Sequence, residues 1–112
     1  MNQARTASER IIAEATSWPG VEAGPGDMGE IEFRVGAREI GHIHGDYAAH
    51  FTFPKDVRAE LSRQGRVAPH PVFPNSPALA ARRIRDEADV LDVIALLRLN
   101  YDRVVAHRVV SA

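Results

Sequence analysis

Apolar and polar side chains alternate along residues 31–35, and a period of two predicts a strand with one buried face. Residues 36–37 fit a two-residue turn, so residues 38–44 are expected to return as the second strand of a hairpin. Residues 50–53 and 79–85 are weaker strand candidates. The pattern therefore predicts an antiparallel sheet of three to four strands.

The register of the hairpin decides which face of the sheet each histidine occupies. With the turn at residues 36–37, Phe33 faces Ile40 and Ile31 faces His42. Side chains paired across two strands share a face of the sheet. We therefore expect His42 and His44 on the apolar face, where they continue the row that Phe33 and Ile40 begin.

Apolar residues at helical spacing predict three helices. The first begins with a capping box at residues 6–9, the second has Pro54 in its first turn, and the third begins after Asp86. Residues 19–29 are rich in glycine and proline, and residues 66–78 contain four prolines, so both are expected to be loops.

Together these elements predict the α+β class, as a single two-layer domain over residues 1–112 with about three helices packed on one face of the sheet. The chain has no cysteine, which excludes disulfides, thiolate metal sites and cysteine nucleophiles. A net charge of −1 and 6% aromatic residues argue against a nucleic-acid partner. No apolar run is long enough for a membrane span and no signal peptide is apparent, so a cytoplasmic location is expected.

The sharpest local feature is the motif Gly-His-Ile-His-Gly-Asp, which contains His42, His44 and Asp46. Two histidines two positions apart on a strand project side by side, which suits capture of a metal ion or paired acid–base chemistry. A mononuclear metal site needs at least a third ligand, for which Asp46, His50 and His70 are candidates. Three interpretations stay open here: a metal site, metal-free ligand or proton chemistry, and histidines with a structural role only.

Two other segments bear on the site. His70 lies between prolines at 69 and 71, whose fixed φ angles would frame a titratable ring, although an exposed loop histidine fits equally well. Residues 24–29 match G-x-G-x-x-G, but a strand follows them and Pro25 removes an amide, which argues against a dinucleotide site.

The last helix carries more apolar surface than one sheet face requires, which predicts a homodimer through that helix. The apolar residues beside its core stripe or in its tail are Leu96, Leu99, Val104, Val105, Val109 and Val110.

Several sequence motifs, taken in their order along the chain, resemble those of a known family. The N-terminal ones are Trp18-Pro-Gly-Val-Glu-Ala-Gly-Pro-Gly26, Glu32-Phe-Arg-Val-Gly36 and Arg38-Glu-Ile-Gly-His-Ile-His-Gly-Asp46. The later ones are Phe53-Pro-Lys55, Ala68-Pro-His70 and Leu96-Leu-Arg-Leu-Asn-Tyr101. Through them the chain resembles the luciferase-domain family, a group of mostly bacterial small domains that also includes the fungal luciferases.

The resemblance implies a chemistry and a set of site residues. Fungal luciferases oxidise a hydroxylated pyrone with molecular oxygen and release carbon dioxide and light, without an organic cofactor or a required metal. Most bacterial members have no established activity. The positions here that match the polar motif of the family are His42, His44, Asp46 and His70, which are therefore the candidate catalytic residues.

One segment departs from the family pattern. Residues 76–84 stand where the family usually has a Gly-Trp pair and an alternating strand, so one expected pocket wall is changed and light emission is not expected. The leading hypothesis is a small cofactor-independent oxygenase or decarboxylase, which would act on an electron-rich ring compound. The alternatives are a non-catalytic module that binds a small molecule at the same histidines, and a His-x-His metal site.

Overall fold

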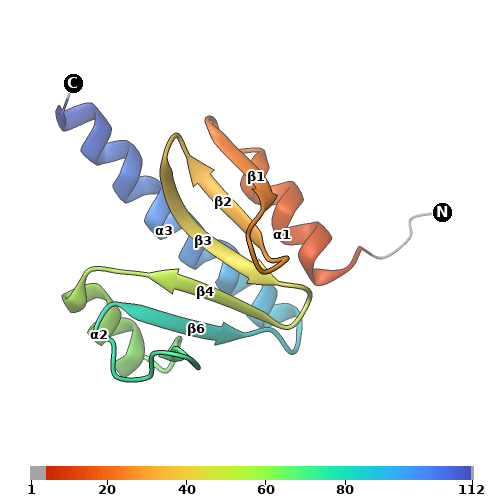
Figure 1. The fold of residues 1–112 in the computed structure, drawn as a ribbon, viewed down its shortest axis with the longest axis vertical. Coiled ribbons are helices and arrows are strands. Elements are labelled where there is room, and N and C mark those ends of the chain that lie inside the picture. The colour runs from red at the N-terminus through yellow and green to blue at the C-terminus, as the bar shows by residue number, and fades with distance from the viewer. Residues whose placement is uncertain (1–4, 112) are drawn as a thin grey trace.

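A six-stranded antiparallel sheet lies at the centre of the structure, a computed structural model that describes residues 5–111, with side chains up to residue 107 (Figure 1). The strands lie in the order β1-β2-β3-β4-β6-β5. Their bounds are β1 Val21–Pro25, β2 Ile31–Val35, β3 Arg38–His44, β4 Ala48–Thr52, β5 Ala68–Pro69 and β6 Leu79–Arg83. The helices are α1 Ala7–Thr16, α2 Lys55–Arg63 and α3 Glu87–Ser111.

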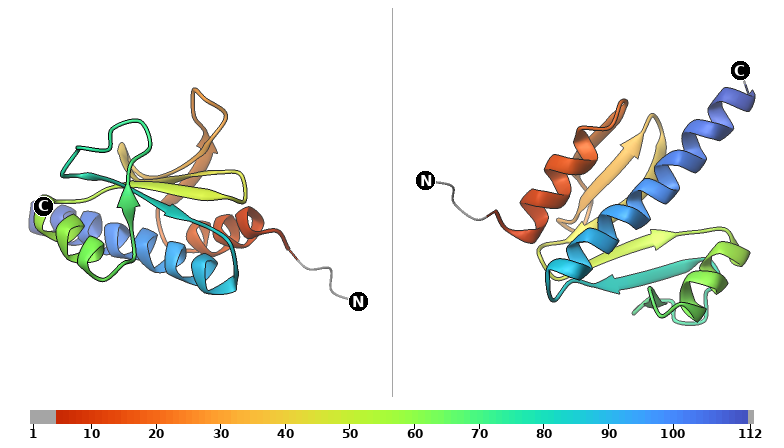
Figure 2. Two further views of the ribbon diagram at one scale, coloured as in Figure 1. Left: turned by 90° about the horizontal axis from the view of Figure 1, so that it is seen from below. Right: turned by 180° about the vertical axis from the view of Figure 1, so that it is seen from behind.

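The helices lie on one side of the sheet, and the left view of Figure 2 shows only connecting loops on the other side. The α+β class and the one-sided helix layer are confirmed. The sheet is larger than expected because β1 forms within residues 19–29, where a loop was predicted. Strand β1 is an edge strand that ends at Pro25, and an edge tolerates proline because one side of the strand makes no ladder hydrogen bonds. A two-residue strand, β5, also forms inside the proline-rich segment.

Both helix starts predicted from capping residues are confirmed. The Thr6 hydroxyl accepts a hydrogen bond from the Glu9 amide at 3.2 Å, and the Glu9 carboxylate accepts one from the Thr6 amide at 2.8 Å. The Asp86 carboxylate accepts from the Asp89 amide at 3.0 Å and caps α3 in the same manner. These contacts satisfy amides that have no partner within a helix.

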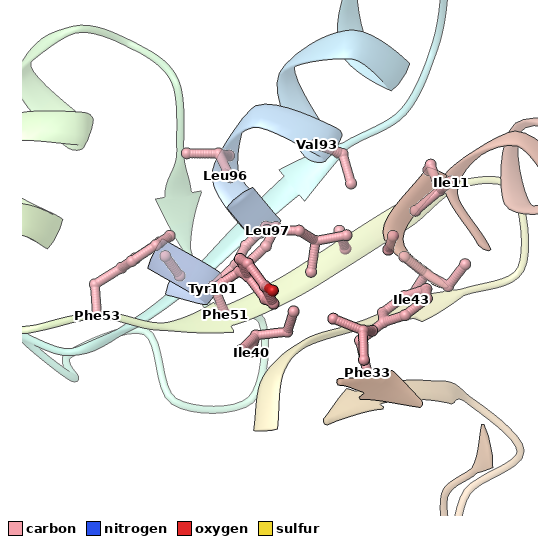
Figure 3. Packing of buried hydrophobic residues seen from close by; sticks show 14 of the residues in the cluster. Ile11, Phe33, Ile40, Ile43, Phe51, Phe53, Val93, Leu96, Leu97 and Tyr101 are labelled. Carbon is pink, nitrogen blue, oxygen red and sulfur yellow. The ribbon is translucent and has the colours of Figure 1, made fainter. Parts of the chain in front are cut away.

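The hydrophobic core lies between the sheet and α3, as Figure 3 shows. Leu96 and Leu97 are both fully buried there, so the prediction that Leu96 lies outside the core stripe is wrong. Leu96 therefore no longer supports a homodimer. Val109 and Val110 lie outside the described side chains, and the homodimer stays a prediction.

The hairpin of β2 and β3 differs from the expected register by one residue, because β3 contains a β-bulge. Phe33 pairs with Gly41 instead of Ile40, and Ile40 is the extra residue of the bulged strand. A shift of one residue moves every later side chain to the other face. The prediction that His42 and His44 lie on the apolar face is therefore wrong: both project from the face opposite the helices, while Ile43 between them is buried.

Close packing on the core side fixes the bulge. A Cβ atom on Gly41 would lie 2.7 Å from Leu97 Cδ2 and 2.9 Å from Phe51 Cδ1, so only glycine fits there without displacing its neighbours. The side-chain amide of buried Asn100 on α3 donates a hydrogen bond to the Ile40 carbonyl at 3.1 Å. This bond pairs a carbonyl that the irregular strand would otherwise leave buried without a partner.

Candidate functional site

Four histidines gather on the face of the sheet that the helices leave uncovered. His42 and His44 come from β3, His50 lies directly opposite His42 on β4, and His70 directly follows β5. Ring centroids are 5.2 Å apart for His42 and His50, and 4.5 Å apart both for His44 and His50 and for His50 and His70. We call these four residues the histidine cluster.

The ring nitrogens of three cluster members come close together. His42, His44 and His50 each offer one nitrogen, and these nitrogens all lie within 4.8 Å of one another. His44 Nε2 and His50 Nδ1 form a hydrogen bond at 3.2 Å, in which one nitrogen carries the proton and the other accepts it. The three side chains are partly buried. Side chains in this arrangement can share a proton or hold a cation between them.

Glu39 is a member of the site that sequence reasoning missed. Its Oε2 atom lies 2.8 Å from His42 Nδ1, so the carboxylate accepts the proton of that ring nitrogen. The two residues are three positions apart in one strand, a spacing that places side chains on opposite faces of a regular strand. The bulge at Ile40 and Gly41 returns them to one face. Gly41 inside a strand pattern was the available signal, because an isolated glycine there often marks a bulge.

His70 joins the cluster with one nitrogen already engaged. Its Nδ1 atom accepts hydrogen bonds from the backbone amides of Val72 and Phe73, at 3.1 and 3.3 Å. Nδ1 is therefore the acceptor, and Nε2 carries the proton of the neutral ring. The Phe73 ring lies 5.6 Å from the His70 ring between centroids, and its side chain is largely exposed. His70 thus brings an N–H donor beside His50, and Phe73 adds an aromatic surface beside His70.

The environment moves the pKa values of the cluster in different directions. The hydrogen bond to Glu39 raises the pKa of His42, against the opposing effect of burial. Burial, followed by the nearby charges of His44, His70 and His42, lowers the pKa of His50 to about 4. Burial is also the main reason that the pKa of His70 is lowered. The site thus makes protonation easier at His42 and harder at His50 and His70.

Acidic residues border the cluster on the β2 side. Glu32 is the cross-strand partner of His42, and Glu30 precedes β2. Both carboxylates, together with Glu39, help to raise the pKa of His42. These carboxylates favour the protonated form of His42.

Asp46 is the predicted site residue that the structure places elsewhere. Its Oδ1 atom accepts a hydrogen bond from the Ser8 backbone amide at 2.8 Å, at the start of α1. This bond is the main cause of its lowered pKa. The structure thus brings together His42, His44 and His70 from the predicted set. It adds His50, which sequence reasoning had considered only as a metal ligand.

Comparison with protein-family models assigns the chain to a family. The model of the luciferase-domain family matches residues 37–100, more than half of the chain, and this stretch includes the four histidines and Glu39. The chain therefore belongs to the luciferase-domain family, as its motifs indicated. Neither a curated protein nor a solved structure matches the chain. Within residues 5–111, no helix is long and apolar enough to cross a membrane.

Proposed function

We propose that this chain is a small enzyme that acts on a compact, electron-rich ring compound at the histidine cluster, in an oxygenation or a decarboxylation. The observation that carries the proposal is the gathering of four imidazoles on the open face of the sheet, one of which, His42, is hydrogen-bonded to a carboxylate. The hydrophobic core lies on the other face, so the cluster is available for chemistry.

His42 is the proposed base. Because Glu39 accepts the proton on Nδ1, the neutral ring keeps Nε2 free as the atom that takes a proton from an acidic hydroxyl or enol of the substrate. The imidazolium that forms remains bonded to Glu39, which stabilises its charge. The substrate anion then reacts with molecular oxygen, which is the oxidant, in an oxygenase. In a decarboxylase the bond from the ring to its carboxylate breaks, carbon dioxide leaves, and the electron pair left on the ring carbon takes the proton from the His42 imidazolium. In this proposal Glu39, and not Asp46, orients the imidazole of His42.

His70 and Phe73 are the proposed substrate-positioning residues. The His70 Nε2–H group can donate to a ring oxygen, and the exposed Phe73 ring can stack on a planar substrate. The site is formed by two strand segments and one loop, so the ligand is a small molecule. Emission of light is not part of the proposal.

The test measures oxygen consumption and carbon dioxide release with a panel of hydroxypyrones and cyclic enols. His42→Gln should lower kcat/KM by about 100-fold or more, the usual contribution of a positioned general base. His107→Gln is the matched control, because His107 is exposed on α3 and outside the cluster. A compound that raises Tm through the cluster but emerges unchanged would assign a non-catalytic binding module. No binding and no turnover across the panel would reject the proposal.

A further inference from the structure

We propose that His42, His44 and His50 form a binding site for one divalent transition-metal ion. The inference concerns the site of the proposed function and names a cofactor for it. It departs from the metal-free chemistry that the resemblance to fungal luciferases implied. It rests on the positions of the ring nitrogens and on the groups that hold the rings.

The nitrogen positions are close to those of a tetrahedral site. Metal–nitrogen bonds of 2.0–2.1 Å at tetrahedral angles place ligand nitrogens about 3.3 Å apart. His44 Nε2 and His50 Nδ1 are already 3.2 Å apart, and the His42 nitrogen completes a triangle within 4.8 Å. An ion between the rings would replace the proton that His44 and His50 now share. Small rotations of the half-buried rings suffice to close the remaining distance.

The scaffold of the three ligands is rigid. His42 and His50 are paired residues of adjacent strands, and His44 lies two positions along β3 on the same face. Backbone pairing between β3 and β4 fixes the positions of the Cα atoms that carry the rings before any ion binds. Sites built on strands hold their ligands more precisely than sites on loops.

Glu39 accepts a hydrogen bond from the non-coordinating ring nitrogen of His42, an outer contact that metal-bound histidines usually have. A histidine ligand commonly donates its second ring N–H to a carboxylate, which fixes the tautomer and makes the binding nitrogen a better donor. The bond from His42 Nδ1 to Glu39 leaves His42 Nε2 for the ion. The carboxylates of Glu39, Glu30 and Glu32 also offset the charge of a dication bound by neutral imidazoles.

His70 lies next to the proposed ligand His50 without being a ligand itself. Its Nδ1 accepts from two backbone amides, and its Nε2 carries the proton, so neither nitrogen is free for a metal ion. Three imidazole ligands leave a tetrahedral ion one open position. The His70 Nε2–H is then a donor to the water or substrate oxygen bound there. A bound ion would act as a Lewis acid that lowers the pKa of a coordinated hydroxyl group, whose proton would pass to solvent. His42 would then be a ligand of the ion, and this chemistry would replace its role as the base.

The experiment uses the untagged full chain after removal of metal with a chelator. A Zn²⁺ titration monitored by calorimetry should give a stoichiometry of one ion per chain. Saturation with Zn²⁺ should also raise the Tm. Co²⁺ should give the visible absorption bands of a tetrahedral site. Single substitutions His42→Gln, His44→Gln and His50→Gln should each weaken Zn²⁺ binding by about 100-fold or more. Glu39→Gln should weaken it by about 10-fold to 100-fold, as for other outer contacts.

One histidine substitution serves as the control for Zn²⁺ affinity. His107→Gln should bind Zn²⁺ as the unmodified chain does, because His107 is exposed on α3 and outside the cluster. Absence of stoichiometric binding, or binding that survives His50→Gln, would overturn the metal site. Undiminished turnover in the chelator-treated chain would overturn the metal as cofactor and leave the proposed base mechanism intact. Stoichiometric binding without turnover of any substrate would uphold the metal site and reject the proposed enzyme.

Discussion

The two faces of the sheet differ in what their side chains do. The face beneath α3 is apolar and closely packed, with Phe33, Phe51 and Leu97 almost fully buried. The other face carries the histidine cluster and the acidic residues beside it. Burial of apolar surface on the first face drives folding. Imidazoles gathered on the second face repel one another when protonated, so we attribute their arrangement to function rather than to folding.

The largest expected contrast comes from two neighbouring residues of β4. Phe51 points into the core and His50 into the cluster. Phe51→Ala should lower the free energy of unfolding by about 3–5 kcal/mol, because it removes a buried ring and leaves a cavity. His50→Ala should change it by about 0.5 kcal/mol or less. Urea denaturation monitored by circular dichroism measures both values.

For Zn²⁺ binding, in contrast to stability, the larger effect should come from substitution of His50 and the smaller from substitution of Phe51. His50→Ala should abolish Zn²⁺ binding, whereas Phe51→Leu, which keeps an apolar side chain and a folded protein, should retain it. Equal loss of stability in His50→Ala and Phe51→Ala would show that the cluster is a second core. The separation of the two faces would then be wrong.

A smaller effect is expected at Gly41, where the two faces are linked. Gly41→Ala places a Cβ atom against Leu97 and Phe51, and such overpacking costs about 1–3 kcal/mol. Because the same bulge aligns Glu39 with His42, this variant should also weaken Zn²⁺ binding. Gly24→Ala on β1 is the matched control, since its Cβ would meet no atom within 4 Å. A stable Gly41→Ala variant with normal binding would disprove this link.

The helix starts and the hairpin turn were largely predictable from local rules. The capping box, the Asp86 cap and the turn at residues 36–37 follow from short-range hydrogen bonding, which a sequence pattern records directly. Strand β1 was missed because its glycine and proline are typical of loops. The strand forms because β2 offers it an unpaired edge, which is a tertiary effect.

The site was only partly predictable for a related reason. The histidines could be chosen by residue type, but the face they occupy depends on one extra residue in β3. The pairing of His50 with His42 required the β3–β4 register, and the Glu39 contact required the bulge. A prediction that assumes regular alternation of side chains between the two faces of a strand contains neither the β3–β4 register nor the bulge. Asp46 was chosen by its proximity in the motif, although its hydrogen bond goes to a residue 38 positions away.

The smallest effect is expected at Asp46. Its substitution tests whether a residue of the Gly-His-Ile-His-Gly-Asp motif has a role in function simply because it belongs to the motif. Asp46→Ala removes the carboxylate that accepts from the Ser8 amide, so Tm should fall slightly while turnover and Zn²⁺ affinity stay unchanged. The same bond lowers the pKa of Asp46 in the folded state. Its stabilising contribution is therefore present above the unfolded carboxyl pKa of about 3.9 and is lost as the pH falls through the lower folded value. The difference in Tm between the two proteins should accordingly disappear in acid. Loss of turnover in a folded Asp46→Ala variant would instead return Asp46 to the catalytic site, and the assignment of the orienting role to Glu39 would be wrong.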